Sequence, residues 1–399
     1  MLRVFCLAMP LLGLTLVSAS AEAPPNLSAN AALKYWQAFA TLPSFTDEDQ
    51  QRLRRESVTM PLDAHAREIV TKADYALRMM HRGAELPRCD WGISYEEGIG
   101  VRLPHMNGVS VLASLTCLRA RMRFEAGKSA NAIDDIIAAL TLSRHASQNG
   151  VLIAVMVGYS TEHRLNETLA LYLPKLSAEE IKKLKTRLDK LPEGGNPASA
   201  MRFEEKGFLD WFVHEVKEAK DKESLLDFLS QLTRDQSDSR EKSREKGRAF
   251  LEECGGAAEG VLKCAEQTRQ SYARMAKQLL LPLDQFQEEF ERESKKQRSS
   301  NPVFHVFFPA LDRVRWSQAR MDVRRALLSA AIAVQLDGRE ALMKHPDPVV
   351  GGPFEYTAFE GGFELRSKLK LDEKLRTKWK LVDERAGEPL TLTVGRRGK

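Results

Sequence analysis

The sequence predicts a mainly α-helical protein, an array of tetratricopeptide-like helical hairpins followed by a small C-terminal antiparallel β meander. Apolar side chains recur at helical spacing from Asn30 to about Met343, which indicates a long series of amphipathic helices. Glycines, prolines and capping residues divide this region into segments of ordinary helix length. From about residue 354 the apolar period falls from about 3.6 residues to two, the period of a half-buried strand.

Three helices are expected close to the N-terminal end of the chain. Ser28 and Asn30 are both good N-cap residues ahead of an apolar stripe, and this first helix is expected to end near Pro43. The acidic residues after Thr46 favour a second helix start, because negative charge interacts well with the positive end of the helix dipole. Pro61 begins a third helix, which is expected to continue to about His81.

Residues 104–173 carry the clearest helical pattern and are expected to form three long helices. Pro104 can occupy a first helical turn, Gly127 can end the first of these helices, and Asn149 with Gly150 separates the other two. Small and apolar residues near the first turn match the packing positions of a tetratricopeptide hairpin: Ala120, Gly127, Ala132, Ile136 and Ala139. Only one such unit is visible, so the sequence supports a hairpin with similar packing and not a proven repeat.

The chain is expected to fold as two helical domains and a C-terminal module. Ser177 and Glu180 form a capping box for a further helix, and the glycines and proline of residues 194–197 make the clearest internal break. The almost purely polar residues 234–248 form either a solvated helix or a linker. The expected divisions are a signal peptide at 1–21, an N-terminal helical domain at 22–192, a second helical domain at 198–345 and a β-rich module at 346–399.

The C-terminal module is predicted to be a small sheet with one apolar face and one basic face. Apolar residues alternate with charged ones over residues 363–371 and with threonines over residues 390–394. Residues 354–359 and the region of Trp379 are expected to complete the meander, which should pack on the preceding long helix. The basic surface comprises Arg366, Lys368, Lys370, Lys378 and Lys380.

The first twenty-one residues have the organisation of a secretory signal peptide. Arg3 supplies a positive start, residues 4–17 form an apolar run, and the small residues that follow favour cleavage after Ala21. An uncleaved anchor is the alternative, although the run is shorter than the roughly 20 residues of a membrane-spanning helix. Cys6 lies inside the run and not at the cleavage point, which argues against lipidation. The mature protein is expected to be exported, to the periplasm or out of the cell.

Positive charge is concentrated at the C-terminal end of the chain. The formal net charge is +5, and residues 365–399 hold eleven Lys or Arg against five Asp or Glu. Anionic lipid or glycan is therefore an expected partner class for the basic sheet, with a merely solvated face as the alternative. Nucleic acid is not expected as a partner of an exported protein. The composition, 43% hydrophobic and 29% charged, excludes wholesale disorder.

Four cysteines follow the expected cleavage point, and an even number in an oxidising compartment favours disulfides. Cys254 and Cys264 flank a diglycine bend and are expected to pair, which leaves Cys89 to pair with Cys117. A disulfide that closes the short loop between Cys254 and Cys264 would contribute about 2–3 kcal/mol to stability. Spacing alone does not prove this pairing, because four cysteines allow three connectivities.

The loop over residues 83–103 and the start of the next helix hold the strongest group of chemically active residue types. Cys89 and Asp90 lie in the loop, and His105 follows it. Glu96 and Glu97 are weak candidates for general acid–base catalysis with His105, since no spacing requires the three to meet. A disulfide together with helix caps explains the same residues without any chemistry.

No motif for a cofactor, a metal or a common hydrolase is present. The chain lacks a phosphate-binding glycine loop, a nucleotide fingerprint, a nucleophile elbow, a zinc-protease helix and a calcium loop. The spacings of His81, Cys89, His105 and Cys117 match no zinc pattern. No cofactor and no metal are expected, and the missing motifs lower the expectation of an enzyme.

Two sets of residues carry a family resemblance. The first comprises residues 30–36, 89–92, 103–105 and 144–145, and the second comprises residues 347–348, 351–353 and 362–365 with Tyr356 and Ser367. They resemble a group of uncharacterised exported helical proteins of planctomycete and verrucomicrobial bacteria, over about half of the chain. The second set is also weakly similar to the end of type II secretion major pseudopilins. Lys368 and Lys370 stand where that pattern offers glycine and acidic calcium ligands, so no metal site is carried over. The resemblance implies compartment and architecture, but no activity.

The expected function is that of a non-enzymatic interaction or scaffold protein of the cell envelope, which binds a protein partner through its helical hairpins. One alternative is a hydrolase or lyase that uses Glu96, Glu97 and His105 on a cell-wall or polysaccharide substrate. Another is peripheral binding to anionic membrane or glycan through the basic sheet, which predicts an affinity that falls with salt.

Overall fold

The computed structural model describes residues 29–148, 150–235, 237–298, 301–308, 311–370 and 388–397. Helices make up most of these residues, and a three-stranded antiparallel sheet lies near the C-terminal end. The predicted mainly helical fold with a small antiparallel sheet is confirmed, while a tetratricopeptide-like repetition stays a prediction. The predicted signal peptide lies outside the described residues. Within them, no helix has the length and apolar character to cross a membrane.

Four short helices form an outer layer of the N-terminal half. Their ranges are α1 (Ala31–Ala40), α2 (Asp47–Glu56), α3 (Ala64–Lys72) and α4 (Asp74–Ala84). The side chain of Asn30, one of the two predicted N-caps, caps α1 by accepting a hydrogen bond from the N–H of Ala32. Helix α2 begins after Thr46 as predicted, and the Thr46 side chain caps it. The single helix predicted to run to His81 is instead split into α3 and α4 at Ala73.

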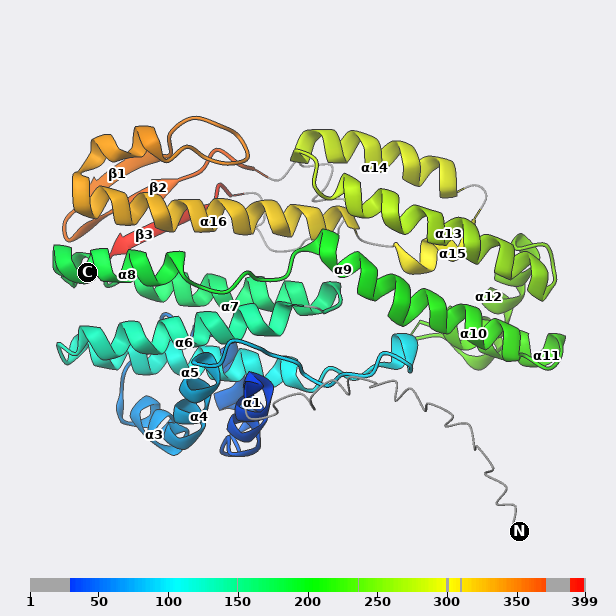
Figure 1. Cartoon of the computed structure of the whole chain (residues 1–399), viewed down its shortest axis with the longest axis horizontal. Helices are drawn as coiled ribbons and strands as arrows, with labels where there is room; N and C mark the ends of the chain where they lie inside the picture. Colours follow the sequence, from blue (N-terminus) through cyan, green and yellow to red (C-terminus); the bar gives the residue numbers. More distant parts are fainter. Residues whose placement is uncertain are drawn as a thin grey trace, which may run out of the picture.

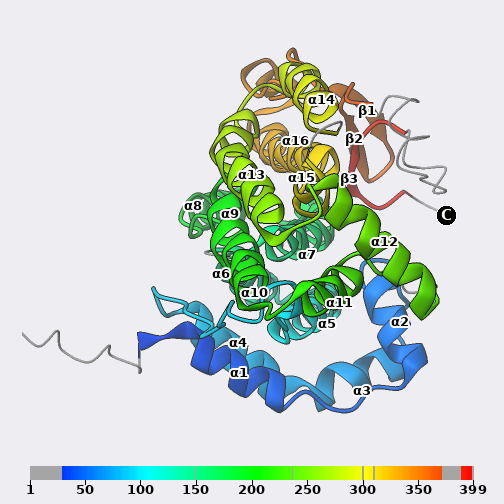
Figure 2. The same ribbon diagram turned by 90° about the vertical axis from the view of Figure 1, so that its right-hand side faces the viewer.

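The central layer consists of the long helices that the sequence predicted most clearly. They are α5 (His105–Glu125), α6 (Ser129–Ser147) and α7 (Leu152–Ala170), followed by α8 (Ala178–Asp189). Gly127 adopts φ +71°, a conformation that favours glycine, and turns α5 back into the antiparallel helix α6. The predicted capping box of Ser177 and Glu180 starts α8. Figures 1 and 2 both place α1, α3 and α4 on the opposite side of α5 from the sheet.

A second group of helices forms the other end of the elongated molecule (Figure 1). Its elements are α9 (Pro197–Glu204), α10 (Asp210–Glu218), α11 (Lys222–Leu232), α12 (Arg240–Glu253), α13 (Ala258–Gln278), α14 (Leu283–Arg298) and α15 (Pro302–Phe307). A π-helical turn, Glu205–Leu209, joins α9 to α10. The polar residues 234–248 were expected to form either a solvated helix or a linker. The solvated helix fits, because α12 begins at residue 240.

The long helix α16 (Leu311–Asp337) leads back to the sheet. The strands β1 (Glu355–Phe359), β2 (Gly362–Arg366) and β3 (Thr391–Gly395) pair in that order, both pairs antiparallel. Apolar side chains of β2 and β3 are buried against α16 and α7, as the alternating pattern predicted. The alternation of burial continues to Lys370, although the strand itself ends at Arg366. The predicted strand around Trp379 lies outside the described residues.

Two hydrophobic cores divide the described residues. The first combines α1–α8 with most of α16 and the sheet, and the second is built from α9–α15. The division near residues 194–197 therefore separates the two cores. Residues of α16 from Trp316 onward, which the sequence placed in the second helical domain, pack in the first core. A small cluster of Val155, Tyr159, Ala200 and Met321 lies between the two.

The four cysteines that follow the predicted cleavage point are free thiols, which corrects the predicted pairing. Cys117 lies on the buried face of α5 that meets α7, where its Sγ lies 3.7 Å from the carbonyl oxygen of Arg164. Cys89 lies in the loop before α5, next to the start of α1. Cys254 ends α12 and its thiol contacts that of Cys264 in α13, and burial raises the pKa of Cys254.

Candidate functional site

A long connection between α4 and α5 is here called the crossing loop (residues 85–104). It leaves the first core, reaches the second and returns to the first (Figure 1). Near its start the N–H of Ala31 donates to the carbonyl oxygen of Arg88 over 2.7 Å. The Asn30 side chain bonds both the N–H and the C=O of Asp90, at 2.9 and 2.8 Å. At the far end Gly98 lies against the indole ring of Trp211 in α10. The loop therefore links α1 to the second core.

Trp91 fixes the loop to the first core through an aromatic cluster. Its ring stacks on His105 with a centroid distance of 4.6 Å and an interplanar angle of 22°. The ring of Phe39 is also stacked with that of Trp91, with a centroid distance of 6.0 Å and an interplanar angle of 11°. The indole N–H donates to the carbonyl oxygen of His145 over 3.0 Å. The residues of the first resemblance set thus meet in space, although they come from four separate parts of the sequence.

Both histidines of this cluster are buried and held neutral. Burial lowers the pKa of His105 to about 4 and that of His145 to about 4, because each imidazolium would lose its hydration. The Tyr35 hydroxyl lies 3.0 Å from Nδ1 of His145 and satisfies that nitrogen. Nδ1 of His105 is buried and has no hydrogen-bond partner among the described residues. His105 therefore keeps one unsatisfied polar atom.

A cavity of about 670 Å³ opens beside this cluster and is called the aromatic cavity. Its lining residues are Pro87, Arg88, Cys89, Asp90, Trp91, Ile93, Tyr95, His105, Ala146, Gln148, Gly150, Ala154 and Phe203. They come from the crossing loop, the start of α5, the α6–α7 turn and α9. A volume of this size is within the range of ligand-binding sites in proteins, roughly 300–1,000 Å³.

The structure brings together only part of the predicted catalytic group. His105 lines the aromatic cavity, whereas Glu96 and Glu97 are exposed further along the loop and do not line it. Cys89 lines the cavity as a neutral thiol, because burial and the neighbouring charge of Asp90 raise its pKa to about 12. The arrangement offers aromatic surface and hydrogen-bonding groups to a ligand.

Glu204 is a titratable carboxyl group that the sequence reasoning missed. It ends α9 beside Phe203, and its Oε1 accepts a hydrogen bond from the N–H of Leu152, the first residue of α7, over 2.7 Å. Burial raises its pKa to about 7, against the opposing effect of that hydrogen bond. No spacing in the sequence indicates this contact, because it joins residues fifty-two positions apart.

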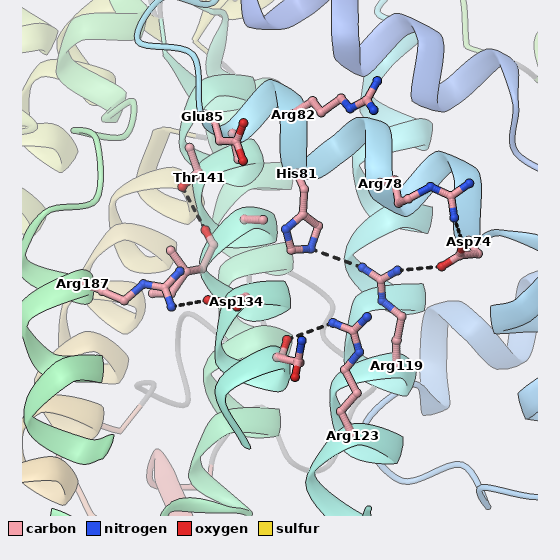
Figure 3. A pocket seen from close by; sticks show the side chains of 14 residues that line it. Asp74, Arg78, His81, Arg82, Glu85, Arg119, Arg123, Asp134, Thr141 and Arg187 are labelled. Carbon is pink, nitrogen blue, oxygen red and sulfur yellow. Dashed lines mark hydrogen bonds and ion pairs between the residues drawn. The ribbon is translucent and has the colours of Figure 1, made fainter. Parts of the chain in front are cut away.

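A second cavity, of about 640 Å³, lies between α4, α5, α6 and α8 (Figure 3) and is called the arginine cavity. Its lining residues are Asp74, Arg78, His81, Arg82, Ala84, Glu85, Arg119, Arg123, Asn131, Asp134, Ile137, Ala138, Thr141 and Arg187. Asp135 lies beneath the lining and is completely buried. Its carboxylate lies 2.7 Å from Nε2 of His81 and 2.7 Å from Nη1 of Arg123, and it accepts a hydrogen bond over 3.0 Å from Nε of Arg119.

The positions of Arg119 and Asp135 in the sequence indicate the ion pair at the arginine cavity. Arg119 and Asp135 are equally far in sequence from Gly127, the turn of the α5–α6 hairpin. Residues equidistant from the turn of an antiparallel hairpin lie opposite each other, so a charged pair on its apolar faces indicates a buried ion pair. Arg123 follows Arg119 by one helical turn and belongs to the same face.

The predicted basic surface of the sheet is only partly within the described residues. Arg366 lies 3.2 Å from Glu364 on the same strand, and Lys368 and Lys370 are exposed beyond its end. Lys378 and Lys380 lie outside the described residues. The basic face that the alternation predicted is therefore present as far as Lys370.

Comparisons with known proteins place the chain in no family, because no family model, no curated protein and no solved structure matches it. Among the described residues, no group of three or more His, Cys, Asp or Glu side chains is arranged to hold a metal ion. The resemblance drawn from the two residue sets stays a prediction.

Proposed function

We propose that this chain is a non-enzymatic binding protein of the cell envelope whose aromatic cavity receives a segment of a protein partner. The observation that carries the proposal is the combination of Trp91, Tyr95 and Arg88 in one cavity wall. Tryptophan, tyrosine and arginine are the residue types that contribute most often to the binding energy of protein interfaces. The guanidinium of Arg88 is exposed and has no partner within the described part of the chain, so it is available to a ligand.

The surroundings of the cavity also favour a partner of some size. Ile153, next to the lining residue Ala154, is 55% exposed. A large apolar side chain beside a cavity adds area to a contact with another protein. The stacked rings of Trp91 and His105 form a rigid wall, so little side-chain entropy is lost when a partner binds.

The chemistry of the cavity supports binding better than acid–base catalysis. A general base works best when its pKa is close to the working pH, and burial holds the pKa of His105 near 4. The two predicted carboxylates, Glu96 and Glu97, are exposed away from the cavity wall. A hydrolase or lyase remains the second proposal, and a Glu96→Ala/Glu97→Ala/His105→Ala triple variant tests it: unchanged turnover of a wall or glycan substrate would remove this assignment.

Crosslinking in the native cell envelope tests the proposal directly. A photoreactive residue at Ile93, in the cavity wall, is expected to capture a reproducible protein partner. The same residue at Leu280, which is 69% exposed in the second half of the chain, serves as the control and should not capture that partner. Capture from both positions, or from neither, would contradict a partner seated in the aromatic cavity.

Affinity for the captured partner provides the quantitative test. Arg88→Ala is expected to weaken the complex at least about tenfold, because arginine is enriched among the few interface residues whose truncation is costly. Arg67→Ala removes an equally exposed arginine from α3 and should leave the affinity within about twofold. Binding that is instead retained by anionic vesicles and lost steeply with salt would favour the basic sheet as the contact.

A further inference from the structure

The positive charge that lines the arginine cavity comes from arginines. None of the lining residues is a lysine, and five are arginines: Arg78, Arg82, Arg119, Arg123 and Arg187. A guanidinium presents its N–H groups in a planar fork that can donate two parallel hydrogen bonds to an oxyanion, whereas an ammonium acts as a point charge. Side chains from four helices converge on this space (Figure 3), so the lining is assembled by the fold and not by one local sequence.

Buried Asp135 orients part of this lining. It holds Arg119 through Nε and Nη2 and Arg123 through Nη1. The side chain of Arg119 is only 7% exposed, so its position is fixed by packing as well as by the ion pair. Two guanidinium groups are thus held in place at the wall of the cavity before any ligand arrives, which lowers the entropy lost on binding.

The hydrogen-bonding inventory of the cavity leaves donors in excess. Each guanidinium carries five N–H donors. Arg78 bonds Asp74 and Arg187 bonds Asp134, each through one nitrogen, and Arg82 has no partner among the described residues. Both oxygens of Asp74 and both oxygens of Asp135 are already engaged. A ligand that only accepts hydrogen bonds and carries negative charge complements this surplus.

We propose that the arginine cavity is a binding site for a phosphate group, either free phosphate or the phosphate of a small monoester. Five arginines and four carboxylates, Asp135 included, stand at the cavity, which gives it a positive surplus of formal charge. The volume of about 640 Å³ exceeds that of one phosphate ion, so an ester with an attached polar body fits better. Glu85 is exposed and unpaired within the described residues, and it faces the same cavity as the opposing charge (Figure 3).

Calorimetric titration of the full chain with inorganic phosphate and with glucose 6-phosphate tests this site. Saturable binding is expected, and tighter binding of the sugar phosphate would show that the ester body is also contacted. Arg82→Gln/Arg187→Gln is expected to weaken binding at least about tenfold, because two charged donors are lost. Arg67→Gln, an exposed arginine outside the cavity, should change the affinity by less than about twofold.

A substitution that is expected to tighten phosphate binding distinguishes a binding role of the cavity from a structural one. Glu85→Gln removes the negative charge at the cavity and is expected to tighten phosphate binding severalfold, whereas a residue that acts only on folding would not improve affinity. The proposal is overturned if neither phosphate compound binds saturably at millimolar concentration. It is equally overturned if the arginine double variant and Glu85→Gln bind both probes as the wild type does.

Discussion

Asp135 is expected to have a large effect on the stability of the α5–α6 hairpin. It is completely buried between Arg119, Arg123 and His81. Asp135→Asn keeps the shape of the side chain but leaves the buried guanidinium of Arg119 with only the longer contact to Asp74, at 3.4 Å, as a counter-charge. We expect a loss of about 3–5 kcal/mol in the free energy of unfolding, measured by urea titration.

The preceding residue provides the matched control for this substitution. Asp134 also bonds an arginine, Arg187, but its side chain is 48% exposed. Because solvent screens exposed ion pairs, Asp134→Asn should cost less than about 1 kcal/mol. Equal losses for the two variants would contradict the buried network, since Asp135 is buried among three partners whereas Asp134 bonds one arginine at the surface.

At the residue scale the sequence predicted caps and burial better than it predicted partners. Asn30 and Ser177 cap their helices as expected, because a cap depends on residues two or three positions away. Glu96 and His105 were grouped because they are close in sequence, but a loop residue and a helix residue need not face the same space. The partner of Glu204 is fifty-two residues away, and no local rule finds it.

The crossing loop is an element whose path depends on one glycine. Gly98 adopts φ +55°, and a Cβ added there would lie 2.0 Å from Cδ2 of Trp211. Gly98→Ala is therefore expected to lose about 3 kcal/mol, from the left-handed backbone and from the displaced indole ring. Gly100→Ala, where a Cβ would meet nothing within 4 Å, should change stability by less than about 0.5 kcal/mol in the same urea titrations. A mild effect at both positions would show that the loop does not pack on α10 in solution.

The start of α7 is predicted to have a pH-dependent stability because of Glu204. Its pKa is about 7 in the folded protein and near 4.5 in the unfolded chain, so the folded state binds the extra proton between these pH values. The contribution of Glu204 is therefore most favourable at low pH and declines as the pH rises towards 7. Over this window the change amounts to about 3 kcal/mol.

Glu204→Gln tests this linkage, because the glutamine oxygen can still accept the hydrogen bond of the Leu152 N–H. Relative to the wild type, the variant should gain about 3 kcal/mol between pH 4 and pH 8, measured as the difference between two sets of denaturation curves. Glu205→Gln, which removes a carboxylate 3.2 Å from Arg269, is the control and should show no such gain at high pH. Parallel pH profiles for wild type and Glu204→Gln would contradict the raised pKa.

At the element scale the long periodic segments were predictable and the interruptions were not. Helices α5, α6 and α7 occupy the predicted region, because each carries an uninterrupted apolar pattern between clear break signals. The break between α3 and α4 falls at Ala73, a residue that favours helix, so no local signal marks it. The π-helical turn at Glu205–Leu209 likewise depends on packing against Tyr95, whose Cβ lies 3.0 Å from a Cβ added at Gly207.

The whole molecule combines two cores that exchange few contacts. Domain limits from the sequence followed composition and breaks, and they divided the chain at residues 194–197 near the gap between the cores. The return of α16 to the first core could not be seen in this way, because that helix follows the second core in sequence but packs against α7. Long-range packing of this kind has no signature in a single sequence.

Separate cores should unfold in separate steps, and one substitution in each core tests this. Leu112 in α5 is fully buried in the first core, and Phe212 in α10 is fully buried in the second core. Truncation to alanine costs about 2–5 kcal/mol at either site. Because the cluster between the cores is small, Phe212→Ala should lower the temperature of one calorimetric transition by about 10 °C and leave the other nearly unchanged.

Leu112→Ala should shift the other transition, which assigns each step to one core. If both variants displace one common transition, the crossing loop and α16 couple the cores into a single cooperative unit. The aromatic cavity is lined from the crossing loop of the first half and from Phe203 of α9, so its shape depends on how the two cores are joined. Two independent transitions would mean that the cavity opens when either core unfolds, and partner binding should then raise the temperature of the less stable transition.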